Sequence, residues 1–236
     1  MLIFALDSTA VVGSVALCRD GVPLASFTVK NGNTHSETLL PMAKALFDVT
    51  GYTPDDVDIF ACSEGPGSFT GVRIGVATVK GLTFGKDKTV IGVSALEAMA
   101  RNLLPAKGLI CPVMNARRGQ VYNALFHADG MELTRLCDDR ALAATALEAE
   151  LIERGEPFYL VGDGVEVTAA AFGKLTSLPV PTLAAEQNAL GVAACALKLY
   201  QDGVRTTDRE LSPTYLRLPQ AERERLEKEK VKDIKA

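Results

Sequence analysis

The chain has 236 residues, of which 47% are hydrophobic and 23% charged, as is usual for a globular protein of one large or two small domains. A formal net charge of -4 argues against a stand-alone RNA-binding protein, because neutralising phosphates requires clustered Lys and Arg. Any link to nucleic acid should therefore run through a partner. No apolar run approaches the roughly 20 residues of a membrane span, so we expect a cytoplasmic protein without membrane contact.

The cysteines are the next constraint on the compartment and the type of fold. There are 5, scattered without C-x-x-C spacing. Separated thiols in odd number suit a reducing cytosol and argue against a disulfide framework or a structural zinc site. We expect them to act as small buried hydrophobic residues.

Residues 2–30 are expected to form three strands. The apolar start of the chain is interrupted by Asp7, which indicates a buried strand and not a signal peptide. Arg19-Asp20-Gly21 carries an Asp-Gly turn signal, so adjacent strands should pair antiparallel. Thr34 and Glu37 then have the spacing of a capping box, which predicts a helix from about residue 35 to 49.

The rest of the chain alternates between expected strands and expected helices. In chain order we expect a strand at 57–63, a helix at 71–84, a strand at 89–94, a helix at 96–103, strands at 109–116, 119–127 and 131–137, a helix at 141–154, a strand at 158–161 and a helix at 184–200. This order predicts two α/β lobes. We place the first lobe at 1–104 plus 187–217, the second at 105–186, and a charged tail at 218–236.

Asp7-Ser8-Thr9 follows the first expected strand directly. An acid with hydroxyl groups in a tight turn can hold magnesium and a phosphate in a nucleotide-binding lobe. The same residues are also common in turns, where their side chains bond nearby backbone amides. The sequence leaves both interpretations open.

The segment Gly65–Gly71 is a glycine-rich loop that opens a helix. Backbone amides at a helix N-terminus can hold an anion, but the lysine of a P-loop is missing, since Val72 and Arg73 follow Gly71. Gly71 and Gly75 lie one helical turn apart, and each interior glycine costs a helix about 0.5–1 kcal/mol relative to alanine. We therefore expect another backbone to approach closely, either from within the chain or from another subunit.

Two further features concern surface contacts and catalysis. The helix after Thr34 has more apolar surface than one buried stripe requires, which indicates a second contact or full burial.

The 2 histidines, His35 and His127, are far apart, so we expect no catalytic metal. His35 beside a serine and a glutamate suggests a hydrolase triad, but local polar structure is the alternative, and no G-x-S-x-G motif is present.

These segments together resemble one family, TsaB, also called YeaZ. The resemblance covers roughly residues 1–217 and rests on Asp7-Ser8-Thr9, His35-Ser36-Glu37 with Leu39-Leu40-Pro41, Gly65–Gly75, Asn115–Gly119, Gly162-Asp163-Gly164 and Pro213-Thr214-Tyr215-Leu216-Arg217. Position 115 is commonly Asp in this family, so Asn115 places an acid role there in doubt. Asn115–Gly119 is either a turn or an exposed recognition loop.

The resemblance implies an α/β, actin-like ATPase (ASKHA, RNase H-like) fold with two lobes. It implies a non-catalytic partner and activator of TsaD, which transfers a threonylcarbamoyl group to N6 of the adenosine beside the tRNA anticodon. TsaE is the other implied partner, a homodimer is expected in isolation, and tRNA contact is indirect. ATP or ADP with magnesium could bind at a complex interface. The alternative is a nucleotide-binding enzyme or a peptidase-like member of the superfamily.

The resemblance also assigns residues. We expect no catalytic and no metal-binding residue, and a vestigial nucleotide site at Asp7, Ser8 and Thr9. The expected partner interface comprises His35, Glu37, Leu40, Pro41, Phe47, Gly71, Arg73, Ile74, Gly75, Thr78 and Leu82. Gly75→Arg or Leu40→Glu should then abolish complex formation while the chain stays folded.

Overall fold

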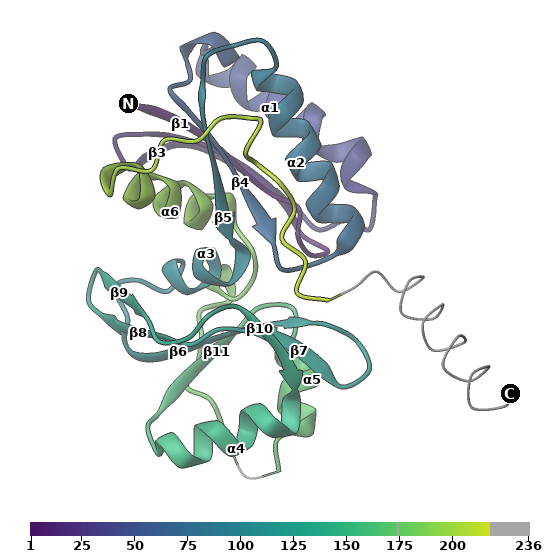
Figure 1. Cartoon of the computed structure of the whole chain (residues 1–236), viewed down its shortest axis with the longest axis vertical. Coiled ribbons are helices and arrows are strands. Elements are labelled where there is room, and N and C mark those ends of the chain that lie inside the picture. Colours follow the sequence, from purple (N-terminus) through teal and green to yellow (C-terminus); the bar gives the residue numbers. More distant parts are fainter. Residues whose placement is uncertain (174, 218–236) are drawn as a thin grey trace, which may run out of the picture.

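The computed structural model describes residues 1–173 and 175–217, so the charged tail expected at 218–236 lies outside the described residues. Two β-sheets lie one beyond the other along the long axis of the molecule, with helix α3 (Ala95–Arg101) between them (Figure 1). In the described part of the chain, no helix has the length and apolar character needed to cross a membrane.

The first sheet has five strands in the order β3-β2-β1-β4-β5. The strands are β1 (Leu2–Asp7), β2 (Gly13–Arg19), β3 (Val22–Val29), β4 (Ile59–Gly65) and β5 (Thr89–Ser94). Strand β2 pairs antiparallel with β1 and β3, while β4 pairs parallel with β1 and β5. The three consecutive antiparallel strands predicted from the sequence are confirmed. Asp20 and Gly21, both at positive φ, form the turn between β2 and β3.

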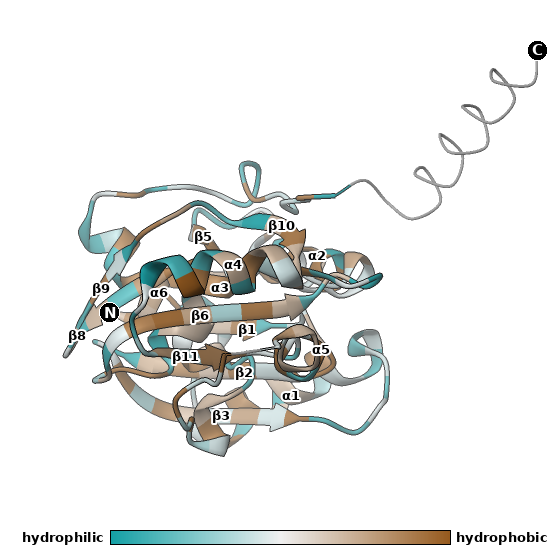
Figure 2. Cartoon of the chain, turned by 90° about the horizontal axis from the view of Figure 1, so that it is seen from below, coloured by the Kyte–Doolittle hydropathy of each residue, from teal (hydrophilic) through white to brown (hydrophobic). Residues whose placement is uncertain are grey.

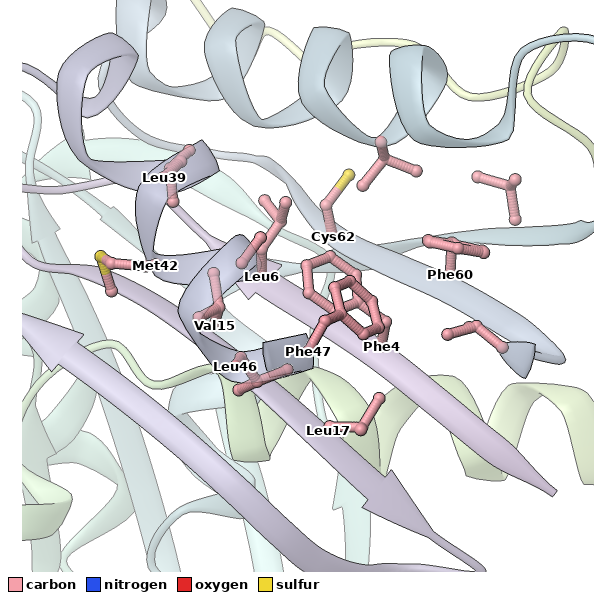
Figure 3. Packing of buried hydrophobic residues seen from close by; sticks show 14 of the residues in the cluster. Phe4, Leu6, Val15, Leu17, Leu39, Met42, Leu46, Phe47, Phe60 and Cys62 are labelled. Atoms are coloured by element: carbon pink, nitrogen blue, oxygen red, sulfur yellow. The ribbon is translucent and has the colours of Figure 1, made fainter. Parts of the chain in front are cut away.

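Helices cover both faces of this sheet. On one face lie α1 (His35–Thr50) and α2 (Phe69–Thr83), and on the other lies α6 (Ala189–Gln201) (Figure 1). Under α1, the rings of Phe47 and Phe4 stack with centroids 5.4 Å apart, and both side chains are buried (Figure 3). Burying side chains of this size contributes about 1.5–3 kcal/mol each, so this layer fixes α1 on the sheet.

The ends of α1 agree only in part with the sequence prediction. Gly51 ends the helix in the left-handed conformation and donates its N–H to the carbonyl oxygen of Phe47, as expected for a C-terminal glycine. Thr34 does precede the helix, but the predicted capping box is wrong. The hydroxyl of Thr34 bonds that of Ser36 at 2.9 Å instead of a backbone N–H.

The second sheet is built around β6. Its strands are β6 (Lys107–Asn115), β7 (Gln120–Asn123), β8 (Phe126–Asp129), β9 (Glu132–Arg135), β10 (Arg140–Ala143) and β11 (Phe158–Val161), and α4 (Ala144–Arg154) and α5 (Val165–Ala171) accompany it. Figure 2 shows the hydrophobic character of β6 and β11. The strand predicted at 119–127 is present as β7 and β8, which are interrupted between Asn123 and Phe126 but keep one register against β6.

The sequence reading missed β10 and α5, and it began α6 too early. Residues 140–143 are rich in helix-forming alanine and leucine, yet they pair with β7, so tertiary contact overrides their propensity. Helix α6 begins at Ala189 because the Asn188 side chain accepts a hydrogen bond from the backbone N–H of Leu190, at 2.8 Å. A separate short 3₁₀ turn, Thr182–Ala184, lies ahead of it.

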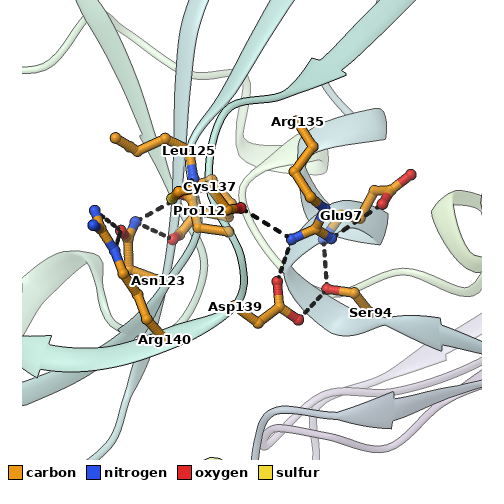
Figure 4. Close-up of polar contacts among 10 residues, drawn as sticks. Ser94, Glu97, Pro112, Asn123, Leu125, Arg135, Cys137, Asp139 and Arg140 are labelled. Carbon is orange, nitrogen blue, oxygen red and sulfur yellow. Dashed lines mark hydrogen bonds and ion pairs between the residues drawn. The ribbon is translucent and has the colours of Figure 1, made fainter.

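Helix α3 and a polar cluster join the two sheets. The helix contributes Ala98 to the core below α6, and Leu96 and Met99 to the core of the second sheet. Beside it, the Arg135 guanidinium bonds Asp139 at 2.6 Å and Glu97 at 3.1 Å (Figure 4). On another side of the junction, Lys30 forms an ion pair with Glu186. Apolar packing and ion pairs together therefore hold the two sheets against each other.

The cysteines are free, as predicted. Cys18, Cys62, Cys111 and Cys195 are buried, and Cys137 is half-buried. Burial raises the pKa of the Cys18 thiol to about 11 and of the Cys111 thiol to about 12. These thiols stay protonated at neutral pH, so they behave as small hydrophobic residues.

Candidate functional site

Asp7 lies at the end of β1 and is 1% exposed. Its Oδ1 accepts hydrogen bonds from the backbone N–H of Thr9 at 2.8 Å and from the Thr9 hydroxyl at 2.7 Å, and its Oδ2 accepts one from Ser63. Burial raises the pKa of Asp7, and the bonds from Ser63 and Thr9 offset that rise in part.

The actin-like fold implies a magnesium–nucleotide site at this turn, but the residues present do not fit one. Asp7 is almost fully buried, and both of its carboxylate oxygens already accept hydrogen bonds inside the chain, from Thr9 and from Ser63. Of the two sequence interpretations, local turn structure matches the geometry. We therefore derive no chemical step through magnesium here.

Three glycines pack the glycine-rich segment onto the same turn. A β-carbon on Gly67 would lie 2.4 Å from the carbonyl oxygen of Thr9, and one on Gly71 would lie 2.1 Å from that of Ser8. One on Gly75 would lie 2.5 Å from the Ser8 hydroxyl oxygen. The backbone whose close approach the sequence predicted thus belongs to the chain itself. The glycines at every fourth position let α2 lie directly on the β1–β2 turn.

Two adjoining cavities lie between the sheets. Their volumes are about 570 Å³ and 750 Å³, and they share Ala10, Val11, Asn115 and Asp163 as lining residues. The motifs that follow β1, β6 and β11 therefore meet at one interlobe cleft, although they are far apart in the sequence. The cleft is the place where a small ligand of an actin-like protein would be sought.

The Asn115–Gly119 segment forms a turn at the edge of this cleft. The side-chain oxygen of Asn115 accepts a bond from the backbone N–H of Arg117 at 2.8 Å, which satisfies the turn prediction. Arg117 and Arg118 have φ of 64° and 55°, an uncommon conformation for side chains of this size. Arg117 also lines the smaller cavity, so the turn places a cation at the cleft.

The outer surface of α1 and α2 is the second candidate site, and we call it the docking face. Seven of the predicted interface residues contribute exposed or half-buried side chains to it: Glu37, Leu40, Pro41, Arg73, Ile74, Thr78 and Leu82. The structure adds the exposed Val49, Ala45, Ala77, Gly81 and Phe84, which lie outside the expected interface set. Leu40 is 54% exposed, Val49 70% and Phe84 81%, so the face is notably apolar.

The remaining four predicted interface residues lie inward. Phe47, Gly71 and Gly75 are buried within the chain, and His35 is half-buried with its Nε2 bonded to the carbonyl oxygen of Ala10 at 2.6 Å. Within this chain these four residues serve in packing, and their part in partner contact stays a prediction. The expectation that Gly75→Arg leaves the chain folded is corrected, because an added side chain would collide with Ser8.

The hydrolase interpretation finds no support in these contacts. The Ser68 hydroxyl oxygen accepts a bond from the backbone N–H of Gly71, as a helix cap. His35 Nε2 is bonded to a backbone carbonyl. Among the hydrogen bonds of the described residues, none joins a serine to this histidine, as an activated nucleophile would require.

Comparison with solved structures supports the fold. YeaZ from Pseudomonas aeruginosa matches with a TM-score of 0.75 and 24% identity, over 91% of this chain and 99% of that one. A second P. aeruginosa structure, described as similar to the peptidase YeaZ, gives a TM-score of 0.77 over 92% of this chain. With its two sheets and its mixed β3-β2-β1-β4-β5 order, the molecule is an α/β protein of the actin-like (ASKHA, RNase H-like) class.

The sequence comparisons then define the family. A family model described as "TsaD: tRNA N6-adenosine threonylcarbamoyltransferase" matches residues 30–224. The tRNA threonylcarbamoyladenosine biosynthesis protein TsaB of Bacillus subtilis (strain 168) is 34% identical over 163 residues, 69% of this chain and 71% of that protein. TsaB of Escherichia coli (strain K12) is 37% identical over 131 residues, about half of each chain. The chain belongs to the TsaB (YeaZ) family.

Proposed function

We propose that the chain acts in the biosynthesis of tRNA threonylcarbamoyladenosine as a non-catalytic partner and activator of TsaD. In this role TsaD transfers the threonylcarbamoyl group to N6 of the adenosine beside the anticodon. The observation that carries the proposal is the docking face, an exposed layer of apolar side chains on α1 and α2. Membership of the TsaB family supports TsaD as the partner.

The composition of the docking face supports protein contact. Folded monomers rarely leave contiguous apolar patches larger than a few hundred Å² in water. Leu40 and Val49 on α1 and Phe84 at the end of α2 are all more than half exposed, while the opposite sides of both helices are buried in the sheet core. Association with another protein would remove these side chains from water.

The chemistry of the remaining surface supports an accessory role. Asp7 is engaged by Thr9 and Ser63, and Asn115 stands where the family commonly has an acid. Residues 1–173 and 175–217 gather no group of three or more His, Cys, Asp or Glu side chains that could hold a metal. The proposal assigns catalysis to the partner, and TsaE, indirect tRNA contact, a homodimer in isolation and a cytoplasmic location complete it.

Reconstitution of the modification tests this function. TsaD, TsaE and the enzyme that makes the threonylcarbamoyl adenylate, all from the same source, are incubated with tRNA, and modified adenosine is measured by mass spectrometry. We expect product only when the chain is added. Equal product without the chain would contradict the proposal.

A further inference from the structure

An aromatic stack holds the guanidinium of Arg73 on the docking face. The rings of Phe69 and Tyr215 are stacked with centroids 4.5 Å apart. Cζ of Arg73 lies 3.8 Å from the centroid of Phe69, and Nε of Arg73 donates a hydrogen bond to the Tyr215 hydroxyl at 2.7 Å. Two residues from α2 and one from the last described segment of the chain therefore position one exposed cation.

This arrangement engages Nε of the Arg73 guanidinium but not its two Nη groups. Of the five N–H donors of a guanidinium, the one on Nε is taken by Tyr215. No hydrogen bond or ion pair joins the four donors on Nη1 and Nη2 of Arg73 to any residue within 1–173 and 175–217. A long side chain normally loses rotamer freedom on binding, and here the stack has already imposed that loss.

We propose that Arg73 binds a carboxylate side chain of the protein partner through its two Nη groups. This inference rests on the proposed function and adds the chemistry by which the partner is recognised. The two Nη groups of a guanidinium match the two oxygens of a carboxylate in a bidentate pair. The fixed orientation of Arg73 aims that pair at one position on the partner.

The surroundings favour a carboxylate over an RNA phosphate. The exposed residues one and two turns further along α2 are Ala77 and Gly81, and Ile74 lies beside them. Small and apolar neighbours let a partner helix come close and exclude water from the ion pair, which is the setting of arginine hot spots. A phosphate backbone requires several clustered cations, and Arg117 and Arg217 line the cavity that Phe69 and Tyr215 also line, so the tRNA measurement below separates the two ligands.

Calorimetry with the TsaD-family protein from the same organism tests the contact. We expect Arg73→Lys to weaken binding about 10-fold or more, because lysine keeps the charge but loses the fork, and Tyr215→Phe about 3- to 10-fold, because only the orienting hydroxyl is lost. Arg205→Lys is the matched control. Arg205 also stacks on an aromatic ring, that of Tyr200, but it follows α6 on the opposite face of the sheet. The affinity of the Arg205→Lys variant for the TsaD-family protein should therefore be unchanged.

Carboxylate labelling of the partner identifies the group bound. With the complex saturated, a carbodiimide and an amine label exposed acids, and mass spectrometry locates them. We expect one Asp or Glu of the partner to be protected by the wild-type chain and labelled in the complex with Arg73→Gln. Circular dichroism and thermal melts of each variant establish that it is folded.

The outcomes separate the two proposals. If the wild-type chain does not bind TsaD, the proposed function fails. If it binds and Arg73→Lys binds equally well, or if no acid is protected, only the inference about Arg73 is overturned. If Arg73→Lys weakens tRNA binding by the complex but leaves the affinity between the proteins unchanged, Arg73 contacts RNA and the inference is again overturned.

Discussion

Gly71 lies so close to Ser8 that a β-carbon at residue 71 would be 2.1 Å from the Ser8 carbonyl oxygen. The Ser8 hydroxyl in turn donates a hydrogen bond to the carbonyl oxygen of Gly71, at 2.9 Å. The two residues thus fasten α2 to the β1–β2 turn through backbone contact on one side and a side-chain bond on the other. Only glycine leaves room for this arrangement.

The first prediction concerns this contact. Gly71→Ala should lower the free energy of unfolding by about 1–3 kcal/mol, because the methyl group overpacks a rigid backbone contact. Gly81→Ala is the matched control on the same helix. Its β-carbon would meet no atom within 4 Å, so it should raise the free energy of unfolding by about 0.5–1 kcal/mol. Urea denaturation of both variants measures the difference, and equal effects would contradict the packing assigned to Gly71.

The sequence predicted the elements around this contact but not its location. Glycines at positions 71 and 75 indicated that another backbone approaches α2, since an interior glycine is otherwise unfavourable. Spacing along a helix cannot say whether that backbone comes from the same chain. The answer depends on contacts between Ser8 and residues more than sixty positions later, which arise only in the folded state.

The same limit applies to the docking face. Leu40 and Arg73 were predicted as interface residues and are exposed, whereas Phe47 has the same apolar character as Leu40 and is buried on Phe4. The helical pattern of α1 alone does not reveal how wide its buried stripe is. Nor could local signals connect Arg73 with Tyr215, although both belong to motifs on which the family resemblance rests.

The second prediction concerns the docking face. Leu40→Glu should weaken complex formation with TsaD about 10-fold or more, because a charge would be buried at an apolar contact. Ile152→Glu also replaces an exposed aliphatic residue with glutamate, but on α4, which packs beside the second sheet. We expect this variant to bind TsaD normally. Co-purification and calorimetry measure both. A Leu40→Glu variant with wild-type affinity and activity would remove α1 from the interface.

The third prediction follows from the raised pKa of Asp7. Because the folded chain holds this proton more tightly than the unfolded chain, the stability contributed by Asp7 falls as pH rises from about 4, the unfolded pKa, up to the folded pKa. Asp7→Asn should remove that fall. The amide oxygen can still accept from Thr9, and the amide nitrogen can donate to the Ser63 hydroxyl.

Urea denaturation at pH 4.5 and pH 7.5 tests this sign. The variant should be at least as stable as the wild-type chain at pH 7.5, and its advantage should shrink at pH 4.5. Marked loss of stability of Asp7→Asn at pH 7.5 would show that the ionised carboxylate is favourable where it lies.

The fourth prediction concerns nucleotide. The isolated chain should show no micromolar binding of ATP with magnesium in calorimetry, because Asp7 is engaged within the chain and no lysine follows the glycine-rich loop. ADP with magnesium serves as a second probe. Micromolar affinity that is lost on Asp7→Asn would establish a nucleotide site and favour the enzyme interpretation.

The position of α6 has a consequence for synthesis on the ribosome. Ala189 and Val192 of this helix cover Ile3 and the rest of one face of the first sheet, and Thr206 then bonds the edge strand at Val90. One core of the second sheet is built from buried residues between 109 and 160, and the other also includes Leu96 and Met99 of α3. The lobe with the first sheet is therefore the first to begin synthesis and the last to be completed. One apolar face of that sheet stays exposed to chaperones until α6 has been made, whereas the lobe with the second sheet can already fold.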